Sequence, residues 1–466
     1  MADYSAEVGA TEVLAAFATA GTKAAPRHLA EVARALIDTV AVTLGGAGAP
    51  GEEILRSWSR TESTDGPSTL WTSGEKTSAS TAALVNGTVA HLLDFDDISP
   101  SMPLHPSAVL FPALVAAAES WGGNAANSER FASAYIVGAA AFRALADVLP
   151  QHVHYARGWH STSTIGRLAC VASLATLGGF DVATTRHALG LVASLTAGSR
   201  PNFGTMTKPL HAGAAARDAV MAVELARAGF TANPSELEEP GGFLERYGDP
   251  SLAPAGSAAQ VLEERLDYWS ESWVSDWGLK RYASCYGTHR GIDAMLRIRE
   301  QRPNDTPVKI VATLHTRGTR PLRKARPTTG TEAKFSLEYT LAVAYLRGRV
   351  LLDDFTAEAF ADQHVHELMP KISVGESDVP PIGPEEFSTG FTVVEATFAD
   401  GTVLAERVEI THGQYADPLT RAELREKVAD CVTAGGYQEQ LADQIIQAVT
   451  GAPGPGFTAV IPRRDS

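Results

Sequence analysis

Seven segments in the first 230 residues carry apolar residues at helical spacing and very few charges, and this pattern constrains the fold more than any other feature. In residues 27–44 the apolar positions recur every three to four residues, which predicts a helix with one buried face. Most of the other segments are rich in Ala and Gly and apolar on nearly all sides, so we expect buried helices whose small residues let neighbours approach closely. These segments span residues 80–93, 108–121, 131–148, 164–177, 182–195 and 212–228.

The pattern changes after about residue 275. Residues 308–316 alternate apolar and polar side chains, as a half-buried strand does. Two further β-rich runs, 391–398 and 402–410, flank Asp400-Gly401, a dipeptide typical of a hairpin turn. Helical patterns occupy residues 331–346, 356–368 and 420–449.

Together these patterns predict a mainly α protein with an inserted α+β domain. We expect residues 1–274 to form the helical domain and residues 275–412 to form the α+β domain. The C-terminal helices of residues 413–466 are expected to pack back on the helical domain.

Charge and cysteine content exclude several classes of function. The chain has 39 basic and 54 acidic residues, a net charge of −15, which disfavours nucleic acid as a partner. Its three cysteines, Cys170, Cys285 and Cys431, form no CxxC pair, which excludes a disulfide framework and a thiolate zinc cluster and fits a reducing cytosol.

Two further sequence features concern the cellular location of the protein. The first residues lack a basic and then apolar signal pattern. The longest clean apolar stretches, such as residues 131–142, are shorter than the roughly 20 residues that a membrane span needs. We therefore expect a cytoplasmic protein with no membrane partner.

Residues 46–51 match GxGxxG, the pattern of a dinucleotide-binding loop. That loop requires a strand before it and a helix beginning within it. Here a predicted helix comes before the glycines and Pro50 interrupts them, so we interpret the segment as a helix end followed by a loop.

An acidic cluster, Asp94-Phe95-Asp96-Asp97, follows a predicted apolar helix. Carboxylates near a helix C-terminus are unfavourable unless cations, a metal or raised pKa values compensate. A solvated loop is one interpretation, although the flanking residues are apolar. A metal site of Asp94, Asp97 and His105 is another, and a metal-dependent hydrolase or cyclase built on Asp94–Asp97 stays open as an alternative.

Four loops place a histidine or lysine where a helix is expected to begin, next to backbone N–H groups that can bind an anion. The fourth also supplies a thiol. The candidate residues, in chain order, are His105; His160 with Thr162; Thr207 with Lys208; and Lys280, Ser284, Cys285 and His289.

A base, an acid and cations that hold an anion are the groups needed for proton transfer at a carbon beside a carboxylate. The sequence therefore predicts an enzyme that abstracts a proton α to a carboxylate of a small di- or tricarboxylate. A non-catalytic helical protein that binds such acids is a further possibility.

Taken in order, these segments resemble the MmgE/PrpD family, which includes 2-methylcitrate dehydratase and cis-aconitate decarboxylase. The similar segments are NGTVAHLLDFDD (86–97), HPS (105–107), GWH (158–160), TKPLHAG (207–213), KRYASCYGTH (280–289), EAKFSLEY (332–339) and DPLT (417–420). The resemblance implies a large helical domain with an inserted α+β lid, a pocket between them, a homodimer, and no metal or organic cofactor.

Position by position, the resemblance places the family's acid, histidines and lysines at Asp94, His105, His160, Lys208 and Lys280. We expect His105 and His160 to transfer protons and Lys208 and Lys280 to bind carboxylates. Asp94 is expected to orient a histidine or lysine.

The chain departs from the decarboxylases of this family at two positions. Ile98 stands where they have Thr, and Cys285 stands where they have His. Residues 203–209 and 284–286 are more similar to the branch that contains iminodisuccinate epimerase. Dehydration like that of 2-methylcitrate dehydratase is therefore our first expectation, with Cys285 as a candidate second acid or base. Epimerisation and decarboxylation of a cis-aconitate type remain as alternatives.

Overall fold

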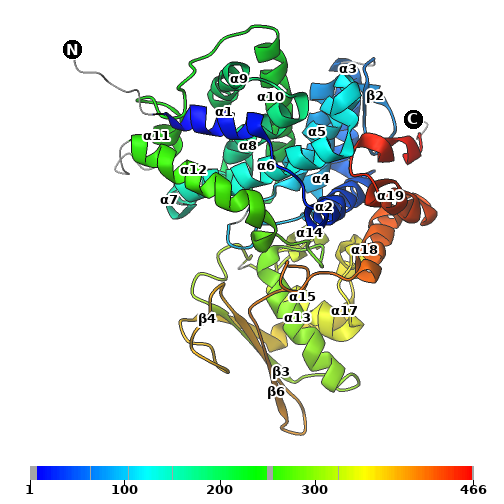
Figure 1. The fold of residues 1–466 in the computed structure, drawn as a ribbon. Helices are drawn as coiled ribbons and strands as arrows, with labels where there is room; N and C mark the ends of the chain where they lie inside the picture. The colour runs from blue at the N-terminus through cyan, green and yellow to red at the C-terminus, as the bar shows by residue number, and fades with distance from the viewer. Residues whose placement is uncertain are drawn as a thin grey trace. The chain divides into compact units, whose positions relative to one another are not determined.

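The computed structural model describes residues 8–62, 65–102, 104–149, 151–248, 255–323 and 325–463. The chain divides into two compact units (Figure 1). A helical unit comprises Met1–Leu92, Asp96–Trp277 and Arg425–Ser466, and an α+β unit comprises Leu93–Phe95 and Gly278–Leu424. The main fold class is therefore mainly α with a smaller α+β part, as the sequence predicts.

The helical unit contains all seven helices that the apolar periodicity predicts. The helices up to residue 277 are α1 (Ala10–Ala20), α2 (Pro26–Gly45), α3 (Pro50–Glu62), α4 (Ala79–Leu92), α5 (Ser107–Trp121), α6 (Ser128–Val148), α7 (Gln151–Ala156), α8 (Ser161–Gly178), α9 (Val182–Ser194), α10 (Thr207–Arg227), α11 (Phe243–Tyr247) and α12 (Ala255–Ser272). A short antiparallel pair, β1 (Ser68–Thr69) with β2 (Lys76–Thr77), precedes α4.

Helices α4, α5, α8 and α10 pack against one another at the centre of this unit. Glycine permits the closest approach. A Cβ atom on Gly213 would lie 2.1 Å from the Leu84 carbonyl oxygen, and one on Gly87 would lie 2.9 Å from the Gly213 Cα. The small residues of these segments therefore bring α4 and α10 into backbone contact, as predicted.

The GxGxxG segment lies between two helices. Helix α2 ends at Gly45 and α3 begins at Pro50, so the glycines form a helix end and a loop, as predicted. No strand precedes them among the described residues of this segment.

Among the described residues, α6 is long and apolar enough to cross a membrane, but 83% of its apolar window is buried inside the unit. Burial of this kind is typical of a core helix. Helices α2 and α3 together pass the same test but are bent by 91° at the break between them.

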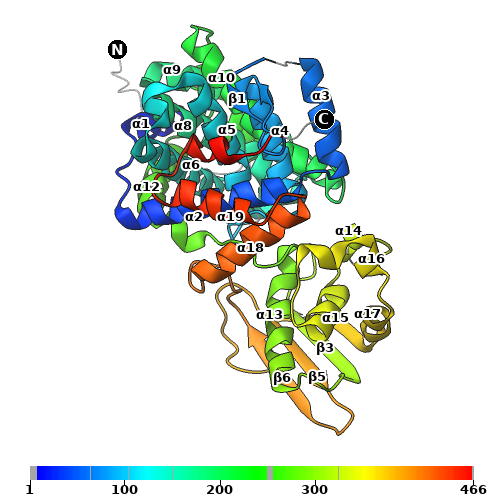
Figure 2. The same cartoon turned by 90° about the vertical axis from the view of Figure 1, so that its right-hand side faces the viewer.

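The C-terminal helical pattern is divided into two helices, which corrects the expectation of one continuous stretch over residues 420–449. Helix α18 (Arg421–Ala434) ends before Gly435-Gly436, and α19 (Gln440–Thr450) follows. Gly436 has a φ of 78°, a conformation that favours glycine and breaks the helix. Helix α19 packs along α2 (Figure 2).

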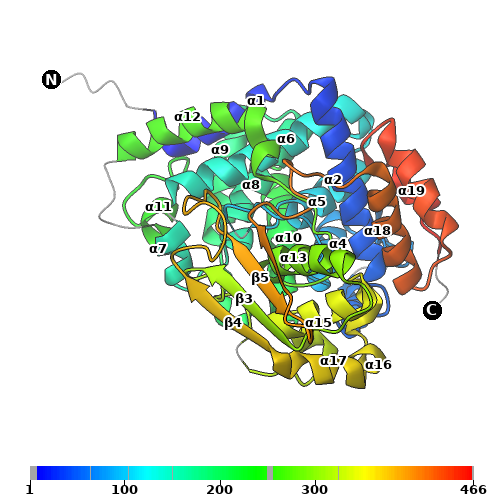
Figure 3. The same ribbon diagram turned by 90° about the horizontal axis from the view of Figure 1, so that it is seen from below.

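The α+β unit has a four-stranded mixed sheet in the order β4-β3-β5-β6. Strand β3 is parallel to β4 and antiparallel to β5, and β5 and β6 form the predicted hairpin. Helices α13 and α15 pack on this sheet (Figure 3). The elements are α13 (Tyr286–Gln301), β3 (Lys309–His315), α14 (Gly330–Ala333), α15 (Leu337–Arg347), α16 (Ala357–Phe360), α17 (Gln363–Leu368), β4 (Ile372–Ser377), β5 (Thr392–Thr397) and β6 (Val403–Val408).

Two helical predictions in this unit are corrected by local capping. The expected helix 331–346 is two helices, because the Ser336 side chain accepts a hydrogen bond from the Tyr339 N–H and caps a new start. The expected helix 356–368 is also divided, because Asp362 caps α17.

Candidate active site

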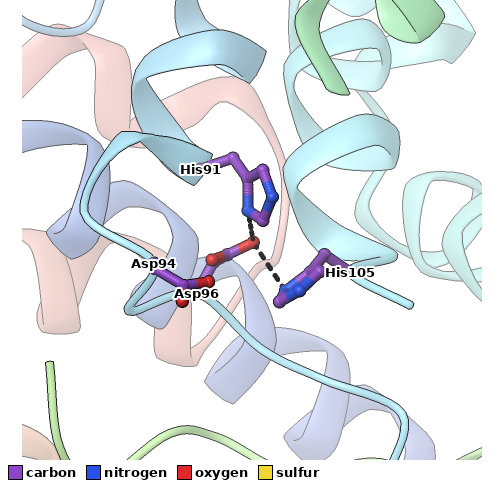
Figure 4. A group of neighbouring side chains, drawn as sticks. All are labelled: His91, Asp94, Asp96 and His105. Atoms are coloured by element: carbon purple, nitrogen blue, oxygen red, sulfur yellow. Dashed lines mark hydrogen bonds and ion pairs between the residues drawn. The ribbon is translucent and has the colours of Figure 1, made fainter. Parts of the chain in front are cut away.

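Two histidines share one buried carboxylate in the helical unit (Figure 4). His91 lies in the last turn of α4, Asp96 in the loop that follows, and His105 two residues before α5. The Asp96 Oδ2 atom lies 2.8 Å from His91 Nδ1 and 3.2 Å from His105 Nδ1. All three side chains are buried, so the acidic loop is not solvated around Asp96.

These contacts determine which nitrogen of each ring carries the proton. The His105 Nδ1 atom also lies 2.9 Å from the Asp97 carbonyl oxygen, which can only accept a hydrogen bond. The His105 Nδ1 atom must therefore donate, and in the neutral ring the Nε2 atom has the lone pair.

Burial and the neighbouring side chains determine the protonation states of His91 and Asp96. Burial lowers the pKa of His91 to about 3, so this ring is neutral and donates its Nδ1–H to Asp96. Burial alone would raise the pKa of Asp96, but the two histidines and their hydrogen bonds hold it well below its usual value. Asp96 is therefore a carboxylate placed to stabilise a proton on either ring.

Asp97 has a different environment. Its carboxylate accepts hydrogen bonds from the Ser107 hydroxyl and backbone N–H and, at 2.6 Å, from the Trp277 indole. The Ser107 hydroxyl also lies 2.7 Å from the Tyr135 hydroxyl. Burial raises the pKa of Asp97 to about 7. The side chain thus ties its loop to α5 and holds its own carbonyl against His105.

A second pair of histidines lies beside the first. His160 is the N-cap residue of α8, and its Nδ1 atom lies 3.0 Å from Nδ1 of His211 on α10. The His91 and His160 rings are stacked with centroids 6.2 Å apart. Burial is the main cause that keeps the pKa of His160 well below its usual value, and the nearby Lys208 cation acts in the same direction.

Thr162, Thr207 and Lys208 lie in the same region of the helical unit. Thr162 is buried, and its hydroxyl accepts a hydrogen bond from the His105 backbone N–H at 3.2 Å. Thr207 and Lys208 open α10. The Lys208 Nζ atom lies 5.6 Å from the centre of the Phe203 ring, which packs edge-on to His160.

In the α+β unit, Lys280 is buried and pairs with Asp94. Its Nζ atom lies 2.7 Å from the Asp94 carbonyl oxygen and 2.9 Å from the carboxylate. Asp94 has a φ of 54°, a conformation rare outside glycine. Lys334 donates to the neighbouring Leu93 carbonyl at 3.0 Å. Two lysines therefore hold residues 93–95 in a strained turn.

The other residues predicted in this unit lie at the start of α13. Cys285 is its N-cap residue, is buried, and has its Sγ atom 3.8 Å from the Pro321 carbonyl oxygen. Ser284 and His289 are also buried, and His289 Nε2 lies 3.2 Å from the Ser284 carbonyl oxygen.

The structure thus brings His105, His160, Thr162 and Lys208 into one region of the helical unit. It adds His91, Asp96 and His211, to which the sequence analysis gave no proton-transfer role. Each lies inside a motif that was quoted for its other residues: His91 and Asp96 in NGTVAHLLDFDD, and His211 in TKPLHAG. Asp94 pairs with a lysine, while the carboxylate that orients the histidines is Asp96.

His91, Asp96 and His105 also offer ligand atoms close enough to bind a metal ion. This set differs from the expected metal site of Asp94, Asp97 and His105, because Asp97 is engaged by Ser107 and Trp277. The two ring nitrogens that face Asp96 donate protons to it or to a carbonyl, and a metal would need those nitrogens deprotonated. The geometry therefore favours proton transfer.

Comparison with known proteins gives a consistent result over both units. The model of the MmgE/PrpD N-terminal domain matches residues 12–253, and that of the C-terminal domain matches residues 282–451. A Homo sapiens protein named cis-aconitate decarboxylase is 27% identical over 413 residues, covering 84% of this chain and 81% of its own length. An Aspergillus terreus protein of the same name is 23% identical over 467 residues, covering 96% of this chain and 94% of its own.

Proposed function

Because the chain belongs to the MmgE/PrpD family, we propose that it is a lyase that acts on a small di- or tricarboxylate, with decarboxylation of a cis-aconitate-like acid as its reaction. The similar proteins named above support this choice over dehydration, which the sequence analysis placed first. Dehydration is the second candidate, because buried Ile98 and Cys285 are the positions where the chain departs from the decarboxylases.

The single observation that carries the proposal is the His91–Asp96–His105 cluster. His105 is oriented through Nδ1, so that Nε2 can take up a proton. Asp96 stabilises the resulting imidazolium, which can then return the proton to carbon.

Decarboxylation uses only the proton-donating half of this cycle, and the histidine regains its proton from water. The bond between carbon and one carboxylate breaks, CO₂ leaves, and the electron pair left on carbon takes a proton from an acid. We assign that proton to His105 or His160. Lys208 is assigned to bind a carboxylate that remains, because a cation stabilises the charge that develops on it.

Product analysis in D₂O tests the proposal. The protein is incubated with cis-aconitate and, separately, with 2-methylcitrate, and the products are followed by NMR. We expect cis-aconitate to lose CO₂ and to gain one solvent deuterium on carbon. Water loss from 2-methylcitrate without CO₂ release would favour the second candidate, and turnover of neither acid would refute both.

Variants of site residues, compared with control variants elsewhere, test which side chains contribute to catalysis. His105→Ala and Lys208→Ala should each lower kcat/KM by about 10²–10⁴-fold if they supply acid–base or electrostatic stabilisation. His187→Ala and Lys23→Ala are controls on α9 and on an exposed segment, and should keep the wild-type rate. Activity that disappears with EDTA and returns with a divalent metal would instead support the metal-dependent alternative.

A further inference from the structure

His160 and His211 meet in an unusual way, through the same ring nitrogen of each. The two Nδ1 atoms are 3.0 Å apart, a hydrogen-bond distance. A hydrogen bond between two nitrogens needs one donor and one acceptor, so one Nδ1 atom carries a proton and the other does not. In a neutral pair the two rings are therefore opposite tautomers.

The surroundings keep this pair neutral. His160 faces Lys208, His91, His105 and His211, and burial is the largest cause of its lowered pKa. Burial also lowers the pKa of His211, with further contributions from the nearby Arg167 and Lys208 cations. After burial, the largest effects on these two pKa values come from neighbouring histidines and from the Arg167 and Lys208 cations.

His160 therefore differs from His105. His105 has Asp96 to stabilise a positive charge, whereas an imidazolium at His160 would be buried among cations and other histidines. The His160 Nε2 atom is buried and has no hydrogen-bond partner among the described residues. Only 1% of His160 is exposed, against 9% of His211.

We propose that His211 is a positioning residue that relays protons for His160, so that the pair exchanges a proton with the substrate without ever holding a net charge. This inference rests on the proposed function. When His160 Nε2–H gives its proton to carbon, the His211 Nδ1 proton moves to His160 Nδ1, and His211 Nε2 takes a proton from water. The reverse sequence removes a proton from carbon. Each step conserves protons and interchanges the two tautomers.

One measurement tests the pair without turnover. Spectra of ¹⁵N-histidine protein, with the two rings assigned by loss of signal in His160→Asn and His211→Asn, report the tautomer of each ring near pH 7. We expect both rings to be neutral and to show opposite or mutually averaged tautomers. An imidazolium at either position, or the same tautomer at both, would overturn the relay.

A second measurement tests the relay in catalysis. An asparagine amide at residue 211 can hydrogen-bond to His160 but cannot pass a proton along, so His211→Asn should lower kcat by about 10²-fold with little change in KM. Added imidazole should restore part of the lost rate in His211→Ala. His187→Asn, whose parent ring bonds to the Ala232 carbonyl at 2.9 Å, is the control and should change neither constant.

The rate of the His211→Asn variant can also refute the relay. If His211→Asn is folded and keeps more than a third of the wild-type kcat, orientation alone is sufficient and the relay is refuted. If the wild-type protein turns over neither acid, the proposed function fails, and the tautomer spectra decide the inference by themselves.

Discussion

Replacement of Asp96 by Asn tests the central feature of the site with almost no change in volume. In the wild-type protein one oxygen, Oδ2, contacts the Nδ1 atoms of both His91 and His105, while Oδ1 is buried without a hydrogen-bond partner among the described residues. The amide oxygen can replace Oδ2. The substitution then removes the charge and leaves the hydrogen-bond geometry.

The expected effect follows from the two contacts. A hydrogen bond to a charged group contributes about 1.5–3 kcal/mol, against about 0.5–1.5 kcal/mol for a neutral pair. Loss of charge therefore weakens the two contacts by about 2–3 kcal/mol in total when a histidine is protonated. At about 1.4 kcal/mol per tenfold change in rate, Asp96→Asn should lower kcat by about 30- to 150-fold.

The assay is steady-state CO₂ release from cis-aconitate, with circular dichroism to confirm folding. Asp354→Asn is the matched control, because Asp354 is an equally buried carboxylate that pairs with Arg347 in the α+β unit. The control should lose stability but keep its kcat. A folded Asp96→Asn protein with kcat within threefold of wild type would refute the role of the carboxylate.

Three further predictions concern stability, each measured as the free energy of unfolding in urea. The raised pKa of Asp97 contributes stability that is complete below about pH 4 and is lost as the pH rises through about 7, so Asp97→Asn should remove this component of the pH dependence. Gly213→Ala should destabilise by about 1–3 kcal/mol because its Cβ would meet backbone, whereas Gly451→Ala, in open space, should not. Lys427 and Asp38 form a fully buried ion pair at 2.6 Å. Lys427→Met should therefore lower the free energy of unfolding by about 3–5 kcal/mol, because it leaves a buried carboxylate unpaired. Adding Asp38→Leu to that variant should restore much of the lost stability.

The sequence predicts the helices well because their signal is local. Each apolar stripe, such as that of α2, needs only its own periodicity. Strand β4 was not predicted, because Ile372–Ser377 contains a glycine and two polar serines and lies at the edge of the sheet beside β3. Its pairing depends on a strand more than 50 residues earlier in the chain, which periodicity cannot reveal.

The site residues also divide into those that the sequence predicts and those that only the tertiary structure reveals. His105, His160 and Lys208 are predictable because each lies at the start of a helix, a position visible in the sequence. The pairing of His160 with His211 is not, because these residues are 51 apart and meet only through the packing of α8 against α10. The choice of Asp96 over Asp94 as the partner of the histidines likewise depends on how the loop turns after α4.

Three helices begin at this site. Helices α5, α8 and α10 begin beside His105, His160 and Lys208, and their N–H groups add partial positive charge. For the proposed function, this partial charge would favour a carboxylate substrate despite the chain's net charge of −15. It also disfavours a proton on His160, in the same direction as burial, which lowers the pKa of this ring. Asp96 lies beside His105 but has no contact with His160, so a proton on His105 is paired with a carboxylate, whereas the proposed relay passes a proton through His160.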